Sequence, residues 1–171
     1  MNQTIGPQEA RFRVYTYKQG LLSALGHDLV LEARKFTIEL RDDGTCLATL
    51  DPNSLRVVGA VHGDRVESMK PSDCDTIEKA IRNEVLHTSR YPEIVIEGTY
   101  EGGTFKGTLS LKGVARPLTL SARETGDSRK IEYSFAPSEH GIPPYKAMLG
   151  ALKIEDRVRV EVEVPVSTLA A

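Results

Sequence analysis

The sequence contains no tryptophan, only two cysteines in 171 residues, and no long apolar run. A membrane-spanning helix needs about 20 consecutive apolar residues, so we expect no membrane span. The two thiols, Cys46 and Cys74, fit reduced structural cysteines better than a disulfide framework. Residues 1–7 show neither the basic nor the apolar segment of a secretory signal. We therefore expect a cytoplasmic protein.

An excess of charge of one sign is also missing. The net charge is −2, and the basic residues are scattered among acidic ones. Nucleic-acid binding normally relies on a basic patch, so we expect no nucleic-acid partner. Hydrophobic residues at 40% and charged residues at 27% are ordinary globular values. A chain of this length is expected to form a single domain over residues 1–171, with a core over about 11–166.

The residues that carry chemistry elsewhere form no recognised motif here. Ser23, His27 and Asp28 lie close in sequence, but the Gly-x-Ser-x-Gly pattern of a nucleophile elbow is absent. The four histidines, at positions 27, 62, 87 and 140, include no pair with metal-ligand spacing. A glycine-rich phosphate loop is also missing. We therefore expect no catalytic residue, no metal site and no cofactor, and do not expect an enzyme.

Apolar and polar residues alternate through the centre of the chain, from residue 91 to residue 120. The apolar positions that define this alternation are Ile94, Ile96, Phe105, Leu109, Leu111, Leu118 and Leu120. A period of two is typical of half-buried antiparallel strands. Gly102-Gly103 supplies the backbone angles of a tight hairpin turn. The segment is therefore predicted to be a β-meander.

Similar patterns predict further strands on both sides of this meander. They cover residues 11–17, 29–33, 35–40, 46–50, 55–61, 130–137 and 156–166. Gly59 is a candidate bulge or bend within one of them. The glycine-bounded segment 20–28 predicts a short apolar turn, and residues 62–75 predict a loop. The loop predicted at 137–150 is a candidate for a lid or for a homodimer contact, and the sequence leaves both open.

One segment changes to the period of a helix. Its apolar residues recur on a single helical face: Ile77, Ala80, Ile81 and Val85. Asp75, followed three residues later by Glu78, resembles a capping box. We predict one helix over residues 76–86, lying across the outside or the mouth of the sheet.

The fold class is therefore all-β, with about eight to ten short strands and one helix. Antiparallel sheets of this size usually split into a sandwich or close into a barrel. An eight-stranded barrel is just wide enough to hold one small ligand. The alternation alone leaves a packed sandwich and a barrel as alternatives.

Several motifs together resemble the YceI-like family of polyisoprenoid-binding proteins. They are Gly26-His27-Asp28-Leu29, Glu84-Val85-Leu86, Tyr91-Pro92-Glu93-Ile94, the segment Gly107 to Pro117, and the Val-x-Val-x-Val closing strand. The resemblance covers most of the chain, from about Phe12 to Val164. It implies a lipocalin-like antiparallel β-barrel of about eight strands, crossed by one helix and enclosing an apolar channel.

The same resemblance implies an isoprenoid or a similar amphiphile as ligand. Family members are often periplasmic and carry a signal, from which this sequence departs. No cluster of basic residues marks a pyrophosphate site, and Arg116 and Lys146 are candidates for that role by position only.

Two functions of different classes remain open. The first is binding of a hydrophobic amphiphile, an isoprenoid or quinone-like lipid, inside the barrel. Small-ligand sites are mostly apolar, and buried prenyl surface contributes about 25 cal/mol per Å². The second is a packed barrel without a lumen, used as a protein-interaction or stress-associated module. The residues predicted to contact the lipid, or to form ordinary core in the second case, are Phe36, Ile38, Ile94, Ile96, Leu109, Leu111, Tyr133, Phe135, Val160 and Val162.

Overall fold

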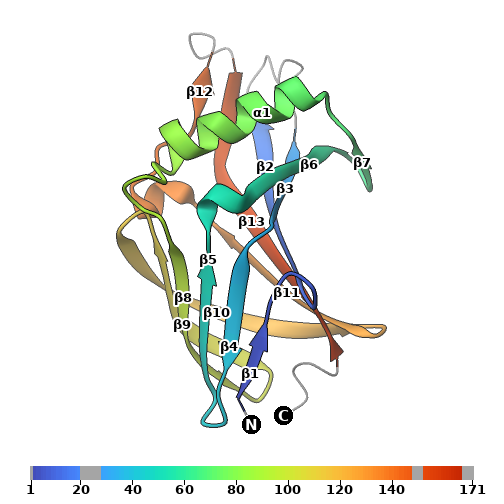
Figure 1. Ribbon diagram of the computed structural model, residues 1–171, viewed down its shortest axis with the longest axis vertical. Coiled ribbons are helices and arrows are strands. Elements are labelled where there is room, and N and C mark those ends of the chain that lie inside the picture. Colours follow the sequence, from blue (N-terminus) through green and yellow to red (C-terminus); the bar gives the residue numbers. More distant parts are fainter. Residues whose placement is uncertain (1, 20–27, 148–151, 167–171) are drawn as a thin grey trace.

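One continuous antiparallel sheet forms most of the protein (Figure 1). The structure is a computed structural model that describes residues 2–19, 28–147 and 152–166. In order across the sheet, its strands are β1 (Gln3–Ile5), β4 (Phe36–Leu40), β5 (Thr45–Leu50), β8 (Ile94–Glu101), β9 (Thr104–Leu111), β10 (Val114–Thr125), β11 (Ser128–Phe135), β13 (Leu152–Pro165), β2 (Arg11–Gln19), β3 (Leu29–Ala33), β6 (Leu55–His62) and β7 (Arg65–Glu67). A short strand, β12 (Lys146–Ala147), pairs with β13 off this path.

The long strand β10 joins the two halves of the sheet. Its residues 114–121 pair with β9, and its residues 122–125 pair with β11. The halves face each other as two layers, with β1, β4 and β5 in front and β2 and β13 behind (Figure 1). The hydrogen-bonded path ends at β1 and β7, so the strand ladder is not closed.

The chain itself crosses between the two halves at a second place. β3 continues into β4 through Arg34 and Lys35, and β5 continues into β6 through a 3₁₀ turn, η2 (Pro52–Ser54). Ser54 is buried and holds these crossings together. Its hydroxyl accepts the Lys35 N–H at 3.0 Å, and its carbonyl accepts the Arg34 N–H at 3.2 Å. Strand pairing therefore links the two halves through β10, and the β3–β4 and β5–β6 connections link them on the side where no strands pair.

The predicted all-β class with one crossing helix is confirmed, whereas the predicted count of about eight strands is too low. Within the described residues, the sheet has 13 strands. The strands that the sequence did not predict are β1, β7 and β12, which are two or three residues long, too short to show alternation.

The predicted turns of the meander are confirmed. Gly102 and Gly103, between β8 and β9, adopt φ angles of 58° and 81°. Residues other than glycine rarely adopt such angles. The predicted irregularity at Gly59 is also present. The β3–β6 register shifts between Val30 and Leu31, so that Val30 pairs with Gly59 and Leu31 with Val57.

The helix begins five residues earlier than predicted. α1 runs over Pro71–Ala80 and continues as a π-helical turn, η3 (Ile81–Val85). Proline suits the first helical position because it needs no amide donor there. The predicted capping box is wrong, because Asp75 lies inside the helix and the N-cap, Lys70, makes no side-chain cap. The loop predicted at residues 62–75 is also wrong, because these residues include β7 and the first turns of α1.

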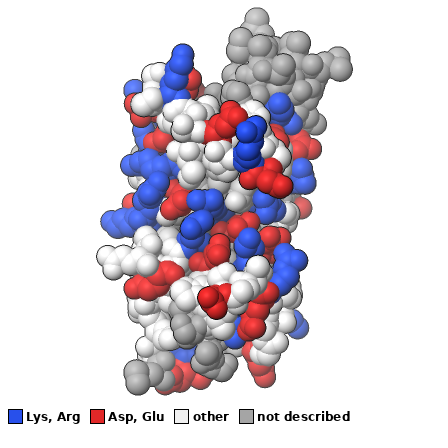
Figure 2. Space-filling model, turned by 90° about the vertical axis from the view of Figure 1, so that its right-hand side faces the viewer, with Lys and Arg blue, Asp and Glu red and all other residues white. Residues whose placement is uncertain are grey.

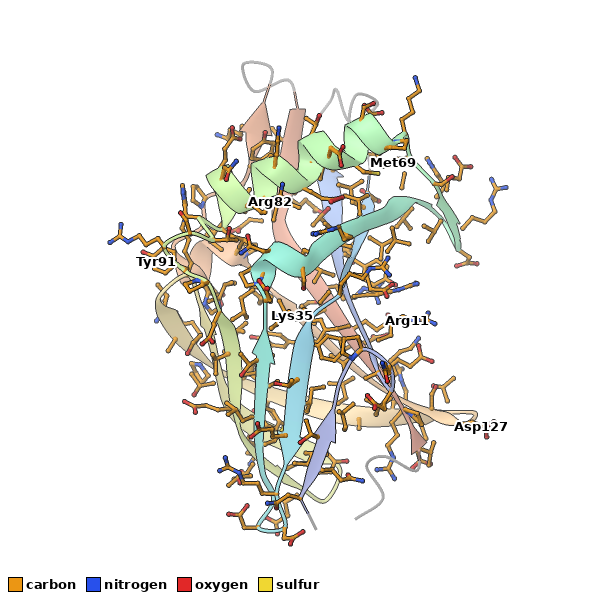
Figure 3. The ribbon with its side chains drawn as sticks, in the orientation of Figure 1. Arg11, Lys35, Met69, Arg82, Tyr91 and Asp127 are labelled. Atoms are coloured by element: carbon orange, nitrogen blue, oxygen red, sulfur yellow. The ribbon has the colours of Figure 1, made fainter. Side chains whose placement is uncertain are left out.

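The helix lies across one end of the sheet, with Met69 and Arg82 near its two ends (Figure 3). Glu78 anchors it to β6 instead of capping it. This side chain is buried, and one carboxylate oxygen accepts the Val57 N–H at 3.4 Å while the other lies 3.6 Å from Nε of Arg56. None of the helices in the described part of the chain is long and apolar enough to cross a membrane.

Two further predicted segments lie partly outside the described residues. In the apolar turn predicted at 20–28, only Asp28 is described, and its carboxylate accepts the Lys18 N–H at 2.8 Å. The loop predicted at 137–150 contains a 3₁₀ turn, η4 (Pro137–His140), and β12, and its residues 148–150 lie outside the description.

Candidate ligand-binding site

Cross-strand pairing places all ten residues predicted to contact a ligand on the inner face of the sheet. Directly paired residues of an antiparallel ladder point to the same side. Ile96 pairs with Ala48 on one side and with Leu109 on the other. Across the other half, Val160 pairs with Tyr133 and with Val14. The ten residues come from five strands, β4, β8, β9, β11 and β13, and share one surface of the sheet.

The apolar residues of this inner face form two clusters. The buried members of the first cluster are Ile5, Ala10, Phe12, Ala33, Phe36, Leu50, Leu55 and Val164. The buried members of the second cluster are Phe105, Leu109, Leu111, Leu118 and Ile142. Leu86, Ile94 and Ile96 pack against both clusters and lie between them.

Most of the predicted contact residues are only partly buried. Phe36, Leu109 and Leu111 are 5–7% exposed. The other seven retain accessible surface although they lie on the inner face: Ile38, Ile94, Ile96, Tyr133, Phe135, Val160 and Val162. Close packing normally leaves inward apolar side chains without accessible surface. The protein's own packing therefore does not fully cover these seven side chains.

The end of the helix packs against both clusters of the inner face. The π-helical turn η3 contributes Ile81 to the surroundings of the first cluster and Val85 to those of the second. π-helical turns are rare and are often found at functional sites. The loop after η4 reaches the same turn, where the hydroxyl of Tyr145 lies near the carboxylate of Glu84. Burial, followed by the nearby Glu84 carboxylate, raises the pKa of Tyr145.

Few polar groups accompany the apolar residues. Burial raises the pKa of Tyr133, and the Glu139 carboxylate adds to that effect, so its hydroxyl stays protonated at neutral pH. Arg116, considered for a pyrophosphate, is exposed, and its Nε–H donates to the Glu139 carbonyl at 3.0 Å. Lys146 is exposed in β12. Among the described residues, Arg116 and Lys146 do not form a cluster of positive charge.

The sequence did not identify His140 as part of this region. The residue ends η4, is 1% exposed, and lies against Phe135 with ring centroids 5.4 Å apart. A histidine in a proline- and glycine-rich segment carries no periodic signal of burial. Its position depends on how η4 folds back onto β10, which only the tertiary structure shows.

Cys46 gives a direct test of the inner face. It pairs with Leu40 and Gly98 and packs against the second cluster, and burial raises the pKa of its thiol to about 11. Because the thiolate is the reactive form, only about one thiol in a thousand is ionised at pH 8. Cys74 lies on α1 and is partly exposed, and burial followed by the nearby Glu78, Asp75 and Asp73 carboxylates raises the pKa of its thiol.

We expect a thiol reagent such as dithionitrobenzoate to modify Cys74 quickly and Cys46 slowly at pH 8. Between pH 8 and pH 9 the slow rate should rise about tenfold, because the thiolate fraction rises tenfold per pH unit below the pKa. Cys46→Ala should remove the slow phase alone. Two equally fast phases would show that Cys46 does not face a protected interior.

The outer face has the opposite character. Figure 2 shows basic and acidic side chains interspersed over one face of the molecule. Among the described residues, the Arg159 guanidinium lies 4.1 Å from the ring centroid of Tyr15 and 3.0 Å from Glu161, which also pairs with Lys130. On the outer face, basic side chains are therefore paired with acidic and aromatic ones. The apolar inner face is the candidate site.

A bent antiparallel sheet with an apolar inner face and one helix across its end defines the lipocalin-like class of proteins. The chain belongs to the YceI-like family, because the YceI-like domain matches residues 30–166. Comparison with curated proteins gives no match.

Two of the solved structures that are similar to this chain illustrate the shared fold. The polyisoprenoid binding domain from Saccharophagus degradans, implicated in plant cell wall breakdown, has a TM-score of 0.63 at 12% identity, over 96% of this chain and 98% of that one. BcnA from Burkholderia cenocepacia has a TM-score of 0.57 at 12% identity, over 91% of this chain and 94% of that one. At such low identity the likeness concerns the fold alone.

Proposed function

We propose that this protein binds one isoprenoid-type lipid between the two clusters of its inner face. The observation that carries the proposal is the partial exposure of seven apolar side chains on that face. Inward apolar surface that the protein leaves open costs free energy in water, and an apolar ligand would recover it. Membership of the YceI-like family and the similar fold of a polyisoprenoid binding domain support the same ligand class.

The ten residues predicted from the sequence form the proposed contact surface, with Leu86 of the helix end closing it. The aliphatic side chains among them suit a flexible prenyl chain. Covering about 200 Å² of such a chain would contribute about 5 kcal/mol. This contribution needs no charged partner, which agrees with the exposed positions of Arg116 and Lys146. We propose binding without catalysis, and no cofactor enters the proposal.

Mass spectrometry of the protein purified from its native host without detergent tests this proposal. Native spectra should contain a complex with one lipid per chain, and organic extracts should contain a prenyl or prenyl-quinone lipid in stoichiometric amount. The alternative, a packed interaction module, predicts a ligand-free spectrum that stays unchanged after incubation with polyprenyl lipids. That result, or stoichiometric recovery of a lipid without a prenyl chain, would overturn the proposal.

A further inference from the structure

His140 presents a buried hydrogen-bonding atom that the protein leaves without a partner. The residue is 1% exposed, its Nδ1 lies 2.9 Å from the carbonyl oxygen of Val114, and its Nε2 has no hydrogen-bond partner. A carbonyl only accepts, so Nδ1 carries the hydrogen of this bond. With the ring singly protonated, Nε2 is left as an acceptor. A buried acceptor without a donor is costly, and such atoms call for an explanation.

The surroundings of His140 connect it to the proposed lipid site. Its ring meets the Phe135 ring at an interplanar angle of 77°, and Phe135 stacks on Tyr133. Both aromatic rings pack against the second cluster and are only partly buried. His140 therefore lies directly beside an aromatic side chain of the inner face.

A second unpartnered atom lies at the same level of the sheet. Phe135 pairs with Val158 on β13, and Val158 pairs with Thr16 on β2. The Oγ1 of Thr16 is buried and has no hydrogen-bond partner among the described residues. This row of the inner face therefore holds one unsatisfied polar atom, and His140 brings a second one against the ring of Phe135 at its end.

We propose that His140 Nε2 accepts a hydrogen bond from a hydroxyl group at the polar end of the bound lipid. The inference rests on the proposed function and narrows its ligand class. The preferred lipid is an isoprenoid that ends in a hydroxyl, such as a prenol, a prenylphenol or a quinol. A prenyl hydrocarbon, ether or quinone offers no donor to Nε2 and binds less tightly.

Geranylgeraniol and its methyl ether are suitable probes, because they share the same prenyl chain and differ in the hydroxyl donor. We expect the wild-type protein to bind the alcohol about tenfold more tightly than the ether, as measured by calorimetry. His140→Asn keeps a side-chain N–H for the Val114 carbonyl and removes the Nε2 acceptor. This variant should bind both probes equally, at the affinity of the ether. His87→Asn, at an exposed histidine after η3, is the matched control and should keep the preference.

Equal affinity of the wild-type protein for alcohol and ether would overturn the inference while leaving the proposed function standing. A preference that persists in His140→Asn would overturn it as well. Failure of both probes to bind would sink the proposed function and the inference together. If His140→Asn does not fold, ¹⁵N spectra of the wild-type protein decide. The Nε2 resonance of His140 should move on addition of the alcohol and stay in place with the ether, and no movement with either would refute the assignment.

Discussion

Gly107→Ala is expected to lower the free energy of unfolding by about 3 kcal/mol, at the upper end of the usual cost of overpacking. Gly107 on β9 pairs directly with Gly98 on β8. A Cβ on Gly107 would overlap the carbonyl oxygen of Glu97 and lie 2.8 Å from Cζ of Phe105. The Glu97 carbonyl belongs to the backbone of the neighbouring strand, so it cannot move aside as a side chain can.

Urea denaturation measures this effect, and Gly6→Ala provides the matched control. A Cβ on Gly6 would meet its nearest atoms at 3.7 Å, an ordinary contact, so this substitution should change the free energy of unfolding by less than about 0.5 kcal/mol. Equal stability of the two variants would show that β8 and β9 are not held as closely as the structure describes.

Ile96→Trp is expected to weaken lipid binding about a hundredfold while the protein remains folded. Ile96 is partly exposed on the inner face and packs against both clusters. An indole at this position would occupy the space proposed for the prenyl chain. Excluding the equivalent of three or four methylene groups of ligand costs about 3 kcal/mol, which is about a hundredfold in affinity.

Tryptophan substitutions at two neighbouring positions distinguish a loss of space for the ligand from a loss of protein stability. Val95→Trp, on the opposite face of the same strand, should leave the affinity unchanged. Leu109→Trp should instead destabilise the fold by about 1–3 kcal/mol, because Leu109 is 5% exposed and is packed within the second cluster. If Ile96→Trp destabilises the protein as much as Leu109→Trp, the inner face is a packed core and the interaction-module alternative gains support.

Local periodicity predicted the strands and the surface they share. Ile94, Ile96, Leu109 and Leu111 alternate with polar residues, and antiparallel pairing aligned those positions on one inner face. This part of the site is a local property repeated in each strand. The sequence could not separate a filled interior from an open one, because exposure depends on how far apart the two layers stand.

The errors lie where tertiary contacts outweigh local signals. Asp75 and Glu78 have the spacing of a capping box, yet Glu78 turns toward Val57 and Arg56 of β6. The helix instead starts at Pro71, in a polar stretch that shows no apolar period. His140 was missed because its burial is created by the contact of η4 with β10. A long-range contact of this kind leaves no trace in the spacing of neighbouring residues.

The position of β13 in the sheet has a consequence for how the protein is made. β13 is the last described strand of the chain, yet it lies between β11 and β2, where Arg159 pairs with Tyr15. Pairings between such distant segments slow folding, because a large loop must close before any contact forms. During synthesis β2 is translated long before β13, so β2 has no partner on this side until residues 152–165 have been made. Until then the unpaired backbone edges of β2 and β11 are exposed to other proteins. In newly made chains, aggregation through these edges therefore competes with completion of the sheet.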